Sequence, residues 1–213
     1  MNLLYSILYE LHTLVKEEAS RGRLDHASKE GHLFEDKVFE KLKEFEPQIS
    51  KIEVRNILEL PTFSGIKNHQ FDCTFVFDGI QYTVECKRQS SGASKNQIYY
   101  FNSTITDHIL GIKADGLSNQ IRGIFLSTED FGENSMIYGI TNAIQVITPK
   151  FPPLGAILTQ VKNDSDLAKM INQTINHSPK RSPFYGTISR FEHSPAQIYQ
   201  EYATILSLWQ NDL

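Results

Sequence analysis

The chain has 213 residues, of which 40% are hydrophobic and 22% charged, and its formal net charge is −4. This composition is typical of a folded soluble protein that buries a core, and no apolar run approaches the length of a membrane span. The negative balance excludes a uniformly basic surface, so any contact with phosphate would need a local basic groove.

The first nineteen residues, MNLLYSILYELHTLVKEEA, predict an amphipathic helix. Glu10, His12 and Lys16 interrupt the apolar residues with helical spacing. The segment has neither a basic start nor a small-residue cleavage site, so we interpret it as a helix and not as a signal peptide, and we expect a cytoplasmic protein.

A second helix is predicted over residues 32–45, after a polar stretch at 19–31. Its apolar stripe consists of Phe34, Val38, Leu42 and Phe45. Glu35 is the one acid on the margin of this stripe. A buried carboxylate needs a partner, so Glu35 either meets one in the interior or extends its head to solvent.

A strand over residues 50–60 and a loop over 61–69 lead into the segment FDCTFVFDGIQYTVECKR, residues 71–88. The pair Asp78-Gly79 between two β-rich runs predicts a hairpin with a type I′ turn. Its register sets Phe77 opposite Ile80. One face is then apolar, with Phe71 and the two cysteines among its residues and the cysteines interpreted as small buried hydrophobes, and the other face is polar.

The same register places Asp72 opposite Glu85 on the polar face. Directly opposed residues have Cβ atoms about 5 Å apart, and two like charges there need a cation between them. Lys87 lies on the same face, two residues beyond Glu85. Carboxylates with open water positions suit Mg²⁺ or Mn²⁺. The alternative is a solvated cluster of ion pairs among these three residues.

Asp72, followed after twelve residues by Glu85-Cys86-Lys87, resembles the D…E-x-K signature of the PD-(D/E)XK, or restriction-endonuclease-like, nuclease superfamily. Phe71 stands where the Pro of that name would be. The resemblance implies that Asp72 and Glu85 hold the metal and that the Cys86 carbonyl adds a ligand. It also implies that Lys87 positions the attacking water or stabilises the transition state. Glu35 matches a helical Glu that joins such sites directly or through water.

The polar run after Lys87 contains Arg88 and Lys95 and no acid. It suits either a phosphate-contacting loop or a solvated linker. A helix is predicted over residues 96–113. Gln97 and Phe101 in it partly resemble the Q-x-x-x-Y motif of the exonuclease-like branch, with Phe in place of Tyr, and we predict that Gln97 assists the site.

Strands at residues 121–127 and 144–148 and a short helix at 135–142 complete the expected order. The predicted fold is an α/β domain with a central mixed β-sheet flanked by helices, which matches the αβββαβ core that the resemblance implies. We expect this core, with its N-terminal helix, to span residues 1–150. Residues 151–213 are expected to form a helical extension packed on it.

Two helices are predicted in the extension, at residues 165–176 and from Ser194 onward. The last helix packs on the core, forms a homodimer or grips DNA. The expected contacts to nucleic acid are the cations Lys67, Arg88, Lys95, Lys180, Arg181 and Arg190.

Together these features predict a Mg²⁺-dependent deoxyribonuclease, as a restriction-type or defence endonuclease. One alternative is a nuclease-fold protein that binds nucleic acid without cutting it. A second alternative is a structural protein that binds partners through its terminal helices and binds no metal.

Overall fold

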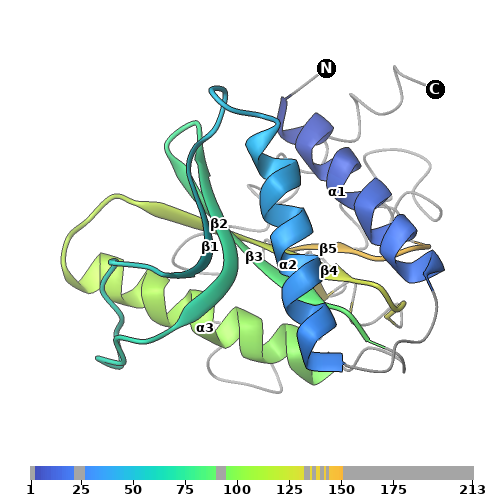
Figure 1. The fold of residues 1–213 in the computed structure, drawn as a ribbon. Helices are drawn as coiled ribbons and strands as arrows, with labels where there is room; N and C mark the ends of the chain where they lie inside the picture. The colour runs from blue at the N-terminus through green and yellow to red at the C-terminus, as the bar shows by residue number, and fades with distance from the viewer. Residues whose placement is uncertain are drawn as a thin grey trace, which may run out of the picture.

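The computed structural model describes residues 3–21, 27–89, 95–131 and 144–150, together with residues 135, 138, 139 and 142. Figure 1 shows this part of the chain in colour. The predicted extension at 151–213, with its two helices and with Lys180, Arg181 and Arg190, lies outside the described residues. The role of that extension, including dimerisation, therefore stays a prediction.

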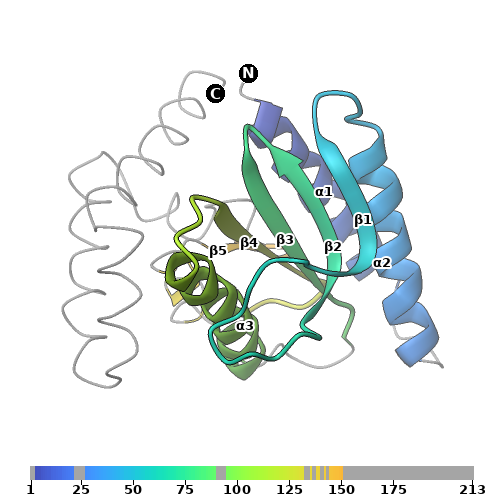
Figure 2. The same ribbon diagram turned by 90° about the vertical axis from the view of Figure 1, so that its left-hand side faces the viewer.

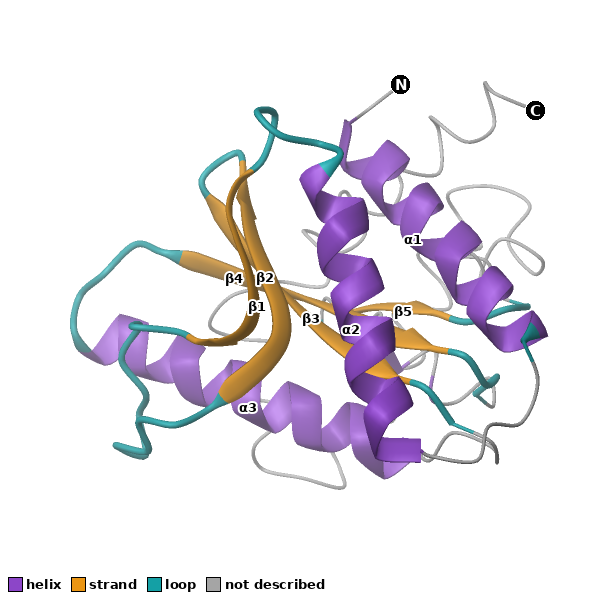
Figure 3. Ribbon diagram, in the orientation of Figure 1, coloured by secondary structure: helices purple, strands orange, loops and turns teal. Residues whose placement is uncertain are grey.

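Three helices and five strands make up the described fold (Figure 3). They are α1 (Leu3–Ser20), α2 (Ala27–Lys43), β1 (Ser50–Ile57), β2 (Gln70–Phe77), β3 (Ile80–Lys87), α3 (Lys95–Ala114), β4 (Gln120–Ser127) and β5 (Ile144–Ile147). Each was predicted from the sequence. The largest differences are that α2 begins five residues before the predicted start and that β1 ends three residues before the predicted end. No helix in the described ranges is both long and apolar enough to cross a bilayer.

The strands form one sheet in the order β1-β2-β3-β4-β5. The first three strands are antiparallel neighbours, whereas β3, β4 and β5 run parallel to one another. Helix α3 connects β3 to β4, and a parallel pair needs such a crossover. Figures 1 and 2 show α1 and α2 on one face of the sheet and α3 on the other. The predicted α/β class with a mixed sheet is therefore confirmed.

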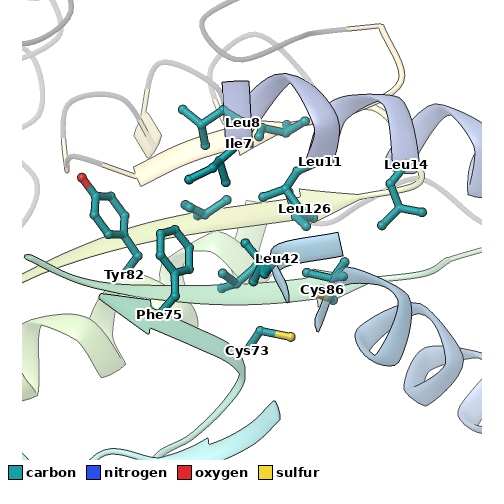
Figure 4. Close-up of a cluster of buried hydrophobic side chains, with 14 of the residues drawn as sticks. Ile7, Leu8, Leu11, Leu14, Leu42, Cys73, Phe75, Tyr82, Cys86 and Leu126 are labelled. Carbon is teal, nitrogen blue, oxygen red and sulfur yellow. The ribbon is translucent and has the colours of Figure 1, made fainter. Parts of the chain in front are cut away.

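Two apolar clusters hold these layers together. The first lies between the sheet and the α1–α2 pair, and Figure 4 shows Leu11, Leu42, Phe75 and Leu126 from four different elements meeting in it. The second lies under α3 and contains Ile98, Phe101, Ile105, Phe125 and Val146 among others. The sheet is therefore buried on both faces.

The hairpin has the predicted register. Phe77 pairs with Ile80, Phe75 with Tyr82, and Cys73 with Val84. Asp78 and Gly79 have φ angles of 51° and 74°, which is the pair of positive values that a type I′ turn requires. Both cysteines are free and buried, as expected.

One expectation for the hairpin faces was wrong, and the polar face is also covered. The polar face is not open, because α3 packs over it and leaves Thr74 and Thr83 fully buried. Phe71 does not join Cys73 in the first cluster but packs under α3, where its ring lies 6.2 Å from that of Phe101 in an edge-on contact. Strict alternation therefore fails at the start of β2.

The loop between β1 and β2 is held against α3. A Cβ on Gly111 would lie only 2.5 Å from the Pro61 carbonyl oxygen, so only glycine permits this approach. The Asp107 carboxylate accepts hydrogen bonds from the Ser64 backbone N–H at 2.8 Å and from the Ser64 hydroxyl. The loop thereby walls a cavity of about 550 Å³ beside the C-terminal half of α3.

Candidate active site

Asp72 on β2 and the pair Glu85 and Lys87 on β3 lie together at one end of the hairpin. Their side chains are 19%, 20% and 32% exposed, so all three are largely shielded from water. The Lys87 ammonium forms an ion pair with Glu85 and lies 4.0 Å from Asp72 Oδ2. The register Cys73 opposite Val84, continued by one residue, sets Asp72 opposite Glu85.

A hydrogen bond across the hairpin fixes the Asp72 side chain. The Cys86 backbone N–H donates to Asp72 Oδ2 at 2.7 Å. The Cys86 side chain points into the first apolar cluster, where burial raises the pKa of its thiol well above the ordinary value. Cys86 thus contributes its backbone to the site, and the carbonyl ligand that the resemblance implies stays a prediction.

The charges around Asp72 are poorly balanced. Burial, followed by the charge of Glu85, raises the pKa of Asp72 from 3.8 to about 7, and Lys87 and the Cys86 N–H offset only part of this. Burial also disfavours the Lys87 cation, but the negative charges of Glu85 and Asp72 outweigh it and raise the pKa of Lys87. The site therefore holds a fixed cation and one carboxylate that is costly to ionise.

Both interpretations of the three residues have support in this geometry. The Glu85–Lys87 pair is the contact that an ion-pair cluster predicts. Burial is the largest cause of the raised pKa of Asp72, and the charge of Glu85 adds to it, as two opposed carboxylates predict when the cation beside them is insufficient. Within the described ranges, no group of three or more His, Cys, Asp and Glu residues has metal-binding spacing. Two carboxylates are nevertheless enough for Mg²⁺, which is often held by one or two and takes its other ligands from water and phosphate.

Glu35 is buried and its partner is a cation, which decides between the two expected alternatives in favour of an interior partner. Arg55 of β1 donates to Glu35 Oε2 at 3.0 Å, and His32 Nδ1 lies 3.0 Å from the same oxygen. Arg55 also donates to Asp36 Oδ1 at 2.7 Å. The charge of Glu35 still contributes to the raised pKa of Asp72. Glu35 therefore acts on the site electrostatically here, and its role as a metal ligand stays a prediction.

Gln97 lies beside the acids, as predicted. It lines a cavity of about 250 Å³ together with Glu85 and Lys87. Its Oε1 accepts a hydrogen bond from Gln89 Nε2 at 2.9 Å. Helix α3 thus brings its first turn to the end of β3, which is how Gln97 reaches the site.

Arg88 does not occupy a position suited to phosphate. Its side chain is only 8% exposed, and its guanidinium donates to Glu18 Oε2 at 3.1 Å and to the Glu18 carbonyl at 3.2 Å. The expected phosphate contact is therefore replaced by an ion pair between α1 and the residue that follows Lys87.

The other predicted cations divide into two groups. Lys67 is exposed in the β1–β2 loop and lines the 550 Å³ cavity, apart from the residues that line the acid site. Lys95 is the first residue of α3, and its side chain is not described.

His69 follows Lys67 by two residues and is held by Asp107 of α3, with 2.9 Å between His69 Nε2 and Asp107 Oδ2. Burial would raise the pKa of Asp107, but hydrogen bonds from Ser64 and His69 outweigh it and lower that pKa.

Three residues of the site region escaped the sequence analysis. Arg55 and Glu18 are partners of predicted residues that lie 20 and 70 positions away, and no local pattern signals such pairs. Tyr100 lines the same cavity as Glu85. Tyr100 follows Gln97 by three residues in the same predicted helix. Without the fold, the sequence does not show that its side chain lies on the side of the helix that faces Glu85.

Comparison with known proteins adds little. No protein-family model matches the chain, and no curated protein matches it. A crystal structure described as a protein of unknown function, AF1548, is similar over 84% of this chain and 97% of its own, with 12% sequence identity and a TM-score of 0.41. A similarity at that level indicates nothing about the function of this chain.

Proposed function

We propose that this protein is a metal-dependent deoxyribonuclease with a restriction-endonuclease-like core, and that it acts as a restriction-type or defence endonuclease. The observation that carries the proposal is the placement of Asp72 opposite Glu85 across the hairpin, both largely shielded from water, with Lys87 as the cation beside them. Burial and the charge of Glu85 raise the pKa of Asp72 in this arrangement. A site built only for stability has no reason to keep two half-buried carboxylates together with one cation.

Each residue of the site has a separate proposed role in phosphodiester hydrolysis. Asp72 and Glu85 would hold Mg²⁺ or Mn²⁺, which supplies a Lewis acid for a phosphoryl oxygen. The hydrogen bond from the Cys86 N–H keeps the Asp72 carboxylate oriented. Lys87 carries a permanent positive charge because its pKa is raised, so it can position the attacking water or stabilise the added charge on phosphorus.

The test is cleavage of circular and linear DNA with Mg²⁺, with Mn²⁺ and with EDTA. Asp72→Ala, Glu85→Ala and Lys87→Ala are each expected to lower cleavage by several orders of magnitude while the fold survives. Circular dichroism and thermal melts check the fold. Wild-type activity in Asp72→Ala would contradict the metal-site interpretation, because that carboxylate is a proposed ligand.

A nuclease-fold protein that binds nucleic acid without cutting it is the second candidate. The Glu85–Lys87 ion pair favours it, since a pairing of this kind leaves one acid less available to a metal. This second candidate predicts that the protein binds DNA but does not cleave it with either Mg²⁺ or Mn²⁺. It also predicts that Asp72→Ala leaves the affinity for DNA unchanged.

A further inference from the structure

The small cavity beside the acids has an aromatic rim. Tyr100 of α3 is 74% exposed, and it lines the same cavity as Glu85, Lys87 and Gln97. A tyrosine at this exposure contributes almost nothing to the core, so packing does not explain its position.

The cavity is lined unevenly. The apolar part of its wall consists of Phe71 and Phe101, which are buried and meet edge to face. Gln70, Gln97 and Thr104 add polar groups to the wall of the cavity. A planar, apolar-faced ring with polar edges has matching chemistry, since its face can stack on tyrosine and its edge can hydrogen-bond to amides.

The volume indicates one ring system and not a longer segment. About 250 Å³ is smaller than the roughly 300–1,000 Å³ of sites for drug-sized ligands. A base inside a duplex has both faces covered by its neighbours and cannot stack on a side chain. An unpaired base can, and its 3′ or 5′ phosphate would then lie toward Glu85 and Lys87, which line the same cavity.

We infer that Tyr100 is a stacking platform for one unpaired nucleobase, which the cavity would take from single-stranded DNA or from an unpaired end. The inference rests on the proposed function for the identity of the polymer. The stacking itself depends only on Tyr100 and its cavity.

The experiment measures binding in EDTA, so that cleavage plays no part. Fluorescence anisotropy gives the Kd of a labelled 12-nucleotide single strand and of a blunt duplex of the same sequence. Tyr100→Ala should weaken single-strand binding on the order of tenfold, within the range found when a stacking aromatic is removed. Tyr100→Phe keeps the ring and should bind the single strand like wild type. Neither substitution should change the Kd for the duplex.

A matched control is Tyr9, which is half exposed on α1 across the sheet from this cavity. Tyr9→Ala should leave both affinities unchanged. A series of single strands, each with one abasic position, sharpens the test. At one position the missing base should weaken binding by wild type. The Kd values of wild type and Tyr100→Ala should then be equal for that strand.

The outcomes separate this inference from the proposed function. Loss of affinity in Tyr100→Ala without any cleavage by wild type would support the platform and contradict the nuclease. Metal-dependent cleavage with identical single-strand Kd values for wild type and Tyr100→Ala would overturn the platform and leave the nuclease intact. No measurable single-strand binding by wild type would also overturn the platform.

Discussion

Asp72 is the residue whose protonation and metal binding distinguish a metal site from an ion-pair cluster. Its charged form is disfavoured by burial and by Glu85, and the nearest positive group, Lys87, is paired more closely with Glu85 than with Asp72. The charge of Glu35 adds to the effect. The fold thus keeps a carboxylate where a proton or a metal ion would stabilise it.

The pH dependence of stability should report this arrangement. The pKa of Asp72 is about 7 in the fold and 3.8 by reference, so between these values the folded protein holds a proton that the unfolded chain has released. The Asp72 contribution therefore makes the free energy of unfolding fall as pH rises from about 4 to about 7. Asp72→Asn should remove this fall and be at least as stable as wild type at pH 8, as measured by urea denaturation.

Asp72→Ala is the control for the hydrogen bond. Asparagine can still accept from the Cys86 N–H, whereas alanine cannot. The alanine variant should therefore be less stable than the asparagine variant by about 1–3 kcal/mol. A wild type more stable than Asp72→Asn at pH 8 would indicate that attraction to Lys87 dominates and would favour the ion-pair cluster.

Metal binding should appear in thermal melts without any substrate. Mg²⁺ that binds the folded site stabilises it by about 2.7 kcal/mol at a concentration 100 times its Kd. The gain should shrink below pH 7, because protons then compete for Asp72. Asp72→Asn and Glu85→Gln should lose the gain entirely. A wild-type melting temperature that does not respond to Mg²⁺ or Mn²⁺ would count against the proposal.

Glu35 should tune the metal site from α2. Glu35→Gln keeps the shape and removes a negative charge that acts on Asp72, so it should weaken the Mg²⁺ effect in the same melts. Asp36→Asn is the matched control, because Asp36 shares the partner Arg55 but is not among the charges that raise the pKa of Asp72. Identical Mg²⁺ titrations for Glu35→Gln and wild type would return Glu35 to a structural role.

At the scale of elements, a buried ion pair connects α1 to the end of β3. Glu18 is almost fully buried and meets Arg88, Lys37 and Arg21. Glu18→Ala would leave Arg88 without its carboxylate, and breaking a buried pair typically costs about 3–5 kcal/mol. Glu17→Ala, one position away and exposed, should cost less than about 0.5 kcal/mol. Chemical denaturation of the two variants tests this, and equal effects would contradict it.

The elements also show what local patterns can and cannot predict. The Asp78-Gly79 turn fixed the register of the hairpin, and with it the meeting of Asp72 and Glu85, because the turn geometry leaves no other pairing. The apolar stripe of α2 placed Glu35 inward for a similar reason. The burial of Thr74 and the partner of Arg88 depend on how α3 and α1 dock, and docking involves residues far apart in sequence.

At the scale of the molecule, β3 belongs to both halves of the sheet. It pairs antiparallel with β2, which brings Asp72, and parallel with β4, which requires the crossover helix α3 that brings Gln97 and Tyr100. Glu85 and Lys87 lie at its carboxyl end, which is where open α/β sheets bind their ligands. The mixed topology is therefore what assembles acids, lysine and aromatic rim at one place.

The irregular outer strand has a consequence for self-association. In the described part of the chain β1 lies at an edge of the sheet, its pairing with β2 shifts between Ser50 and Glu53, and Lys51 and Arg55 have φ angles of 50° and 51°. Such kinks are unfavourable for non-glycine residues, yet they turn the free edge into a poor template for a strand from another copy. Arg55, which pairs with Glu35, is thus also one of the residues that make this edge irregular.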